Sequence, residues 1–228
     1  MLEPDDFDNE FIVSPKFDRR TKEGKAASAE FERQCGLFDT KEIIDEETYT
    51  TLLEMQKALY ETPFVKLLIK GEHEKSFFWT DEKTGIKCKC RPDSFGQVKG
   101  EYVCIDLKTT KDAGIQKFSR DALTLGYDIQ AAHYCDGLEK KYGKPFKFLF
   151  IAQEKTAPYL VNVFEADEYF MKSGRELRDS LLEKYAKCLK EDKWPGYIDE
   201  TSVVTNLSVP AWLRESLDAD DDEGGEFE

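Results

Sequence analysis

The strand-like stretch VCIDLKTT, which begins at Val103, constrains the fold most strongly, because two opposite charges interrupt residues typical of a buried β-strand. Successive side chains of a strand point to opposite faces, so Ile105 and Leu107 share the core face with Val103. Asp106 and Lys108 lie together on the other face, with Cα atoms about 7 Å apart. An Asp-x-Lys pattern alone is typical of a cross-strand ion pair. Further residues are therefore needed to indicate a site.

The rest of the chain alternates between strand-like and helix-like periods. We expect helices over the basic segment that precedes Gln34, over Asp45–Tyr60, over Gln116–Tyr142 with a break at Gly126, and over Asp167–Glu191. We expect strands in KSFFWTDEKTGIKCKCRPD, which reads as a β-hairpin with a turn at Asp81–Gly85, in EYVCIDLKTT, FKFLFIAQEK and YLVNVFEA, and a turn in SFGQVKG. This order predicts an α/β fold with a central mixed β-sheet flanked by helices.

Length and composition favour one folded domain. The chain has 228 residues, of which 40% are hydrophobic, and we expect a single domain over 1–213 followed by an acidic, disordered tail over 214–228. There is no apolar run of roughly 18 residues, and the N-terminus is acidic where a signal peptide is basic. Six cysteines without a CxxC pair indicate reduced thiols rather than a zinc site. We therefore expect a soluble, cytoplasmic protein without a membrane partner.

The net charge of −14 argues at first against a nucleic-acid partner, since phosphate binding depends on Lys and Arg. The charge is unevenly distributed. Residues 215–228 contain eight acidic and no basic residues, which gives −8 of the total. Residues 83–120 contain nine basic and four acidic residues, a local charge of +5. The basic part of the chain surrounds the Asp106-x-Lys108 pattern.

A second carboxylate precedes this pattern in the motif CRPDSFG. Asp93 ends the strand before a turn, and antiparallel pairing can bring its carboxylate beside that of Asp106. Two such carboxylates repel unless a divalent cation lies between them, and oxygen ligands suit Mg²⁺, with Mn²⁺ as a substitute. Lys108 is then placed to hold or deprotonate a water, or to offset charge on a phosphodiester.

A third element is the segment GYDIQAAHYCDG. Gln130 and Tyr134 are four residues apart and share one face of the expected helix. Alone, such a pair is typical of an amphipathic helix that is partly buried. Together with the two strands it indicates side chains that line the same site.

These residues resemble the motif series of the PD-(D/E)XK nuclease superfamily, in the RecB-like branch with a Gln-x-x-x-Tyr motif, and are similar to RecE-type exodeoxyribonucleases from Leu2 to about Leu213. The resemblance implies Mg²⁺-dependent, 5′-to-3′ degradation of linear double-stranded DNA from its ends, which leaves 3′ single strands for a RecT-like single-strand annealing protein in homologous recombination. It also implies a ring-shaped homo-oligomer. By position it makes Asp93, Asp106 and the backbone carbonyl of Leu107 metal ligands and Lys108 the catalytic lysine.

The resemblance further implies that Gln130 and Tyr134 organise the site, and it aligns Glu74 with an additional acidic position. In the family a metal-binding histidine precedes the segment that starts here at LEP, and neither His73 nor His133 corresponds to it. Two alternatives stay open at this point. One is a related endonuclease or single-strand nuclease, since the same site cuts many substrates and the fold does not fix polarity. The other, which the missing histidine motivates, is a DNA-binding fragment or subunit with impaired catalysis.

Overall fold

The structure is a computed structural model, which describes residues 10–36, 41–197, 207–209 and 214. The chain divides into two compact units, Met1–Ala186 and Lys187–Glu228. The strands that the structure describes, and the helices that cover them, belong to the first unit, apart from the end of the last helix. Within the described residues no helix is long and apolar enough to cross a membrane.

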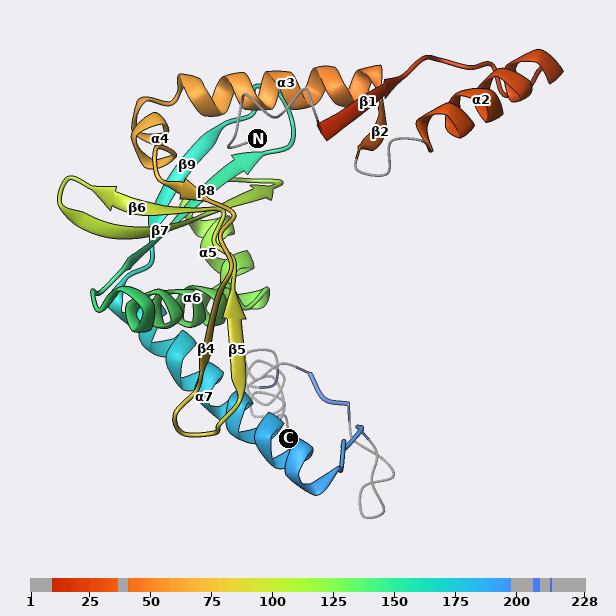
Figure 1. The fold of residues 1–228 in the computed structure, drawn as a ribbon. Helices are drawn as coiled ribbons and strands as arrows, with labels where there is room; N and C mark the ends of the chain where they lie inside the picture. Colours follow the sequence, from red (N-terminus) through yellow and green to blue (C-terminus); the bar gives the residue numbers. More distant parts are fainter. Residues whose placement is uncertain (1–9, 37–40, 198–206, 210–213, 215–228) are drawn as a thin grey trace, which may run out of the picture. The chain divides into compact units, whose positions relative to one another are not determined.

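The elements follow one another in the order strand, helix, strand, two helices, five strands, two helices, two strands and a long helix (Figure 1). Their bounds are β1 Phe11–Ser14, α2 Lys22–Cys35, β2 Glu42–Asp45, α3 Glu46–Glu61, α4 Pro63–Leu68, β3 Glu72–His73, β4 Phe77–Thr80, β5 Lys87–Cys90, β6 Ser94–Val98, β7 Glu101–Thr110, α5 Ile115–Thr124, α6 Tyr127–Tyr142, β8 Lys147–Glu154, β9 Val161–Glu165 and α7 Glu168–Glu191.

The central sheet has five strands in the order β3, β6, β7, β8 and β9. Strands β7 and β8 are parallel and every other neighbouring pair is antiparallel, so the sheet is mixed. The parallel pair is joined through α5 and α6, as a crossover connection requires. Strands β1 and β2 form a separate parallel pair, and β4 and β5 a separate antiparallel hairpin. Strand β7 lies at the centre of the main sheet.

Each face of the central sheet is covered by helices (Figure 1). On one face, Val103 and Ile105 of β7 pack with Leu59 of α3 and Leu68 of α4 in an aliphatic cluster. On the other face, aromatic side chains of β8 pack with residues of α5, α6 and α7. The buried apolar area on both faces is the main source of the sheet's stability.

Several helix boundaries follow from local chemistry. Asp45 caps α3, with its carboxylate accepting a hydrogen bond from the Thr48 N–H at 2.7 Å. Asp167 likewise accepts from the Phe170 N–H at 2.8 Å at the start of α7. The break at Gly126 is confirmed, because its φ of 70° lies in the left-handed region that favours glycine and separates α5 from α6.

Other local expectations were wrong. The segment SFGQVKG is strand β6 followed by a tight turn at Lys99 and Gly100, both with positive φ. It is therefore β6, rather than the β4–β5 hairpin, that pairs with β7. The sequence expectation also omitted the short elements β1, β2, β3 and α4. Most of the acidic tail lies outside the described residues, so the domain boundary at 213 stays a prediction.

Candidate active site

The opposite charges on β7 form an ion pair at the polar face of the strand. The Lys108 Nζ atom lies 2.6 Å from Asp106 Oδ2. Only 4% of the Asp106 side chain and 19% of the Lys108 side chain are exposed. An ion pair this buried is desolvated, so its electrostatic interactions are stronger than those of surface pairs. Asp106 and Lys108 are therefore a charged pair in the interior of the fold.

Asp93 precedes β6 by one residue and lies beside this pair. The register of the antiparallel strands places Ser94 opposite Ile105, and its continuation places Asp93 opposite Asp106. Asp93 Oδ2 accepts a hydrogen bond from the Leu107 N–H at 2.7 Å. We expected that antiparallel pairing can bring the two carboxylates together, and the register agrees with this. The strand that pairs with β7 is β6, which follows Asp93 in the chain. The role of the Leu107 carbonyl as a metal ligand stays a prediction.

The two carboxylates share an excess of negative charge. Burial, together with the nearby charge of Asp93, raises the pKa of Asp106 to about 6, and Lys108 and Gln130 oppose this rise. Burial also raises the pKa of Asp93, against the Leu107 N–H and the charge of Lys108. One ammonium group therefore leaves the pair of carboxylates only partly neutralised.

Helix α6 supplies the third side of the site. The Gln130 Nε2 atom donates a hydrogen bond to Asp106 Oδ1 at 2.6 Å. Tyr134, one turn further along α6, packs edge-to-face against Phe148 of β8, with ring centroids 6.3 Å apart. Burial raises the pKa of Tyr134, and a hydrogen bond with Gln130 opposes this. The structure thus brings both residues of the expected helical pair to the face of the sheet that carries Asp106.

Glu74 lies outside this hydrogen-bonded group. Its carboxylate forms an ion pair with Arg91 at 2.6 Å, and its backbone carbonyl accepts a hydrogen bond from the same guanidinium. The residue has a φ of 53°, which is uncommon for a residue other than glycine. Its role as an additional acidic group of the site stays a prediction.

Sequence reasoning missed two neighbours of the site. The Tyr127 ring lies under the Lys108 ammonium, with Nζ 4.5 Å from the ring centroid. Tyr127 precedes Gln130 by three residues, so helical spacing is a signal that could have found it. His73 lies in β3, and its Nδ1 atom is 3.2 Å from the Asp93 carbonyl oxygen. Nothing in the sequence marks that contact, because 20 residues separate the partners.

A family model described as a PDDEXK-like domain of unknown function, DUF3799, matches residues 1–206. The chain belongs to this family. The expected fold class is confirmed, since the PDDEXK-like chain has a mixed sheet flanked by helices. The narrower resemblance to RecE-type enzymes and to the Gln-x-x-x-Tyr branch stays a prediction.

The chain is also similar in structure to a crystal structure of a protein from Eubacterium rectale that is described as a putative exonuclease, with a TM-score of 0.51 and 16% identity over 79% of this chain and 67% of that one. This likeness shows a shared fold. A second solved structure, of a protein named SSO0001, has a TM-score of 0.35 and 12% identity over 64% of this chain and 60% of that one. No curated protein matches the sequence.

The PDDEXK superfamily is typically dependent on divalent metal ions. Within the described residues no cluster of three or more His, Cys, Asp or Glu side chains has a geometry that could hold a metal. Asp93 and Asp106 nevertheless fit such an ion chemically, because they are neighbouring oxygen donors whose pKa values burial raises. A cation beside them would relieve the repulsion that Lys108 offsets only in part. Water or backbone carbonyls would complete its ligands.

Proposed function

We propose that this chain is a metal-dependent nuclease that hydrolyses DNA phosphodiester bonds at the site formed by Asp93, Asp106 and Lys108. The observation that carries the proposal is the buried Asp106 carboxylate, which accepts from Gln130 at one oxygen and pairs with Lys108 at the other. A structural ion pair needs no second carboxylate beside it, whereas a phosphodiester site needs ligands for a cation and a positive group for the phosphate. The name of the Eubacterium rectale neighbour agrees with this function.

In this proposal Asp93 and Asp106 hold the cation, which is Mg²⁺ or Mn²⁺ and supplies Lewis-acid polarisation of a phosphate oxygen when bound. Gln130 fixes the orientation of the Asp106 carboxylate, and the Leu107 N–H fixes that of Asp93. Lys108 donates to the attacking water or to a phosphate oxygen, where it offsets the charge that develops. The water oxygen forms a bond to phosphorus and releases one proton to solvent, the bond between phosphorus and the leaving oxygen breaks, and the leaving oxygen takes up one proton from solvent.

The narrower form of the proposal is a 5′-to-3′ exonuclease that acts on linear duplex DNA and leaves 3′ single strands for an annealing protein. A ring-shaped homo-oligomer belongs to the same proposal, since a closed ring keeps one DNA end in contact with the enzyme over many cycles. The likeness of the motif series to RecE-type enzymes supports this form. The local charge of +5 over residues 83–120, the stretch of sequence that contains Asp93, Asp106 and Lys108, supports DNA as the substrate.

Nucleotide release from 5′-phosphorylated linear duplex DNA tests the proposal. The chain should release acid-soluble nucleotides with Mg²⁺ or Mn²⁺ and release none with EDTA. The same DNA in circular form should stay intact, and a label at the 3′ end of either strand should persist in single-stranded DNA.

Two results would redirect the proposal. Cleavage of circular DNA would favour an endonuclease on the same site, because the fold alone does not set polarity. DNA binding without metal-dependent cleavage at any Mg²⁺ concentration would overturn the enzymatic function and leave a DNA-binding subunit.

A further inference from the structure

The β4–β5 hairpin is a two-stranded ribbon with faces of opposite character. The side chains of Phe77, Cys88 and Cys90 are buried on its inner face. On its outer face Phe78 is 76% exposed, and its cross-strand partner Lys89 is exposed as well. A phenylalanine exposed to this extent contributes nothing to the core.

The inner face is fixed to α6 by close packing. The Trp79 ring stacks at a tilt over His133, with ring centroids 4.7 Å apart. A β-carbon on Gly137 would come within 2.5 Å of the same Trp79 ring, so only glycine allows this approach. The His133 Nε2 atom also lies 3.2 Å from the Lys89 carbonyl oxygen. These contacts hold one side of the ribbon and determine which side remains exposed.

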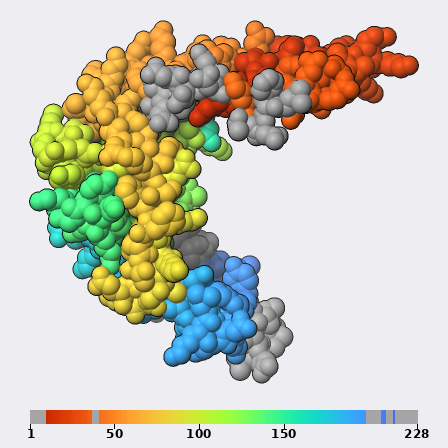
Figure 2. Space-filling view, in the orientation of Figure 1, coloured from red at the N-terminus to blue at the C-terminus, as the bar shows by residue number. Residues whose placement is uncertain are grey.

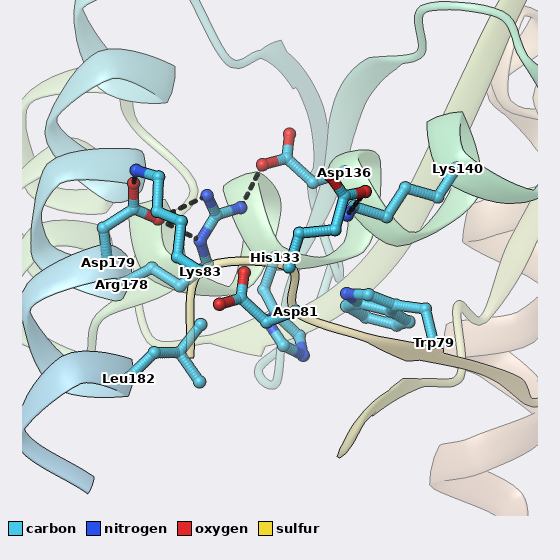
Figure 3. Close-up of a pocket in the computed structure, with 10 residues that line it drawn as sticks. Trp79, Asp81, Lys83, His133, Asp136, Lys140, Arg178, Asp179 and Leu182 are labelled. Carbon is cyan, nitrogen blue, oxygen red and sulfur yellow. Dashed lines mark hydrogen bonds and ion pairs between the residues drawn. The ribbon is translucent and has the colours of Figure 1, made fainter. Parts of the chain in front are cut away.

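Ion pairs at the turn of the hairpin strengthen this attachment (Figure 3). Lys83 pairs with Asp179 of α7, and Glu82 pairs with Lys140 of α6, each at 2.9 Å. The side chains around them line a cavity of about 210 Å³. The basic residues of its lining, Lys83, Lys140 and Arg178, all form ion pairs with acidic residues. The first two of these ion pairs attach the turn of the hairpin to α7 and α6.

The positive charge on the outer face of the hairpin comes from lysines. Lys87 and Lys89 are exposed, and neither has an ion-pair partner among the described residues. The acidic residues nearest to them in the chain contact other groups, since Glu82 pairs with Lys140, Asp81 accepts a hydrogen bond from the Thr84 hydroxyl, and Asp93 accepts one from the Leu107 N–H. Figure 2 shows the hairpin, in yellow, on the surface of the molecule in this view. In a chain with a net charge of −14, two unpaired lysines beside an exposed ring are complementary to nucleic acid.

The hairpin also lies close to the candidate active site along the chain. Strand β5 ends at Cys90, and Asp93 follows within three residues. An extended chain spans at most about 3.6 Å per residue, so the Cα atoms of Lys89 and Asp93 lie within roughly 14 Å. That distance corresponds to roughly four nucleotides at the rise of 3.4 Å per nucleotide in duplex DNA. A strand bound at the site can therefore reach the outer face of the hairpin.

We propose that Phe78, Lys87 and Lys89 bind an unpaired stretch of DNA next to the candidate active site. The Phe78 ring stacks on one unpaired base, and the two ammonium groups contact flanking phosphates. An unpaired stretch is required because the faces of paired bases are covered by their neighbours in the duplex. The proposal rests on the nuclease function proposed above and adds the place where the enzyme holds single-stranded DNA.

Binding to labelled DNA, measured by fluorescence anisotropy with EDTA, tests the proposal without cleavage. With a labelled single strand, Phe78→Ser in the full chain should weaken binding about fivefold to tenfold. With a blunt duplex the same variant should bind like wild type. The double variant Lys87→Gln/Lys89→Gln should lower the slope of log K against log salt by about 1.4, since each single-strand phosphate contact contributes about 0.7.

Matched variants on the opposite face of the sheet serve as controls. Phe64→Ser changes a phenylalanine that is 45% exposed, and Lys57→Gln/Lys66→Gln removes two exposed lysines, of which Lys57 pairs with Glu61 one helical turn away. Both should bind single strands like wild type. Phe78→Trp keeps an exposed ring and should restore binding. A Trp variant that binds as weakly as the Ser variant would overturn the stacking role.

The experiment separates this proposal from the nuclease function. Hairpin variants that bind single strands like wild type would overturn the hairpin's role, while nucleotide release in Mg²⁺ would still support the nuclease. A wild-type chain that neither binds DNA nor releases nucleotides would overturn the proposed function and the hairpin's role with it. Equal weakening of single-strand and blunt-duplex binding by Phe78→Ser would contradict stacking on an unpaired base.

Discussion

The two faces of strand β7 are both buried, yet burial has different consequences on each. On the aliphatic face, Val103 and Ile105 are 4% and 0% exposed and pack against α3 and α4. On the other face, Asp106 is 3% exposed beneath α6 and keeps an ionisable group. Burial of an apolar group stabilises the fold, whereas burial of a carboxylate raises its pKa and stores electrostatic energy. Mutations on the aliphatic face should therefore lower stability, and mutations on the face that carries Asp106 should lower activity.

The largest effect is expected on the polar face. Lys108→Ala should lower the rate of DNA cleavage about a hundredfold to a thousandfold, because the group that offsets charge on the phosphate is lost. Single-turnover nucleotide release would measure this, and anisotropy should show DNA binding close to wild type. A variant with wild-type turnover would refute the role of Lys108.

The next effect is expected on the aliphatic face. Ile105→Ala should lower the free energy of unfolding by about 2–5 kcal/mol, since it removes buried methylene groups and leaves a cavity. Urea unfolding would measure the loss. At a temperature where the variant is folded, its cleavage rate per folded molecule should equal that of wild type. A large loss of rate in the folded variant would break the division between the two faces.

The pH dependence of stability should distinguish the faces further. The folded-state pKa of Asp106, about 6, lies above the ordinary value of 3.8, so between these values the folded protein binds a proton that the unfolded chain does not. The free energy of unfolding of the metal-free protein should therefore fall as pH rises from 4 to 6, by on the order of 2 kcal/mol. Asp106→Asn should flatten this dependence, and Ile105→Ala should leave it in place.

Such a series is measured by urea unfolding in EDTA across that pH range. If the free energy of unfolding changes equally with pH in wild type and Asp106→Asn, a group other than Asp106 causes the pH dependence.

The smallest effect concerns Tyr127, which lies under the Lys108 ammonium. A cation–π contact contributes about 0.5–1 kcal/mol, so Tyr127→Leu should slow cleavage roughly twofold to fivefold. Tyr127→Phe retains the ring and should cleave like wild type. The pH profile of cleavage should shift in the Leu variant alone if the ring acts through Lys108. A Phe variant as slow as the Leu variant would assign the effect to the hydroxyl group instead.

Part of the fold followed from sequence patterns that are local. Helices α3, α6 and α7 and strands β7, β8 and β9 were expected close to their observed positions, because period and capping residues are readable along the chain. Strand β6 was missed because its Gly96 and Gln97 resemble a turn, although pairing with β7 overrides that local preference. The two-residue strand β3 is too short for any period to indicate.

The candidate site likewise has one part that local sequence patterns predict and another part that they do not. The helical period places Gln130 and Tyr134 on one face of their helix, and strand alternation places Asp106 and Lys108 on one face of theirs. The contact of Asp93 with the Leu107 N–H and that of His73 with the Asp93 carbonyl join residues distant in the chain. Contacts of this kind depend on the pairing register, which the sequence does not state.

The sequence by itself determined which side chains share a face, because backbone geometry fixes the periods of strands and helices. Only the tertiary structure decided that α6 covers the polar face of β7 and that β6 brings Asp93 opposite Asp106. It also decided that the hairpin turns Phe78 outward while Trp79 packs on α6. Burial and long-range pairing depend on which helices and strands pack together. The packing that forms is the one that minimises the free energy of the whole chain, so a local pattern does not determine it.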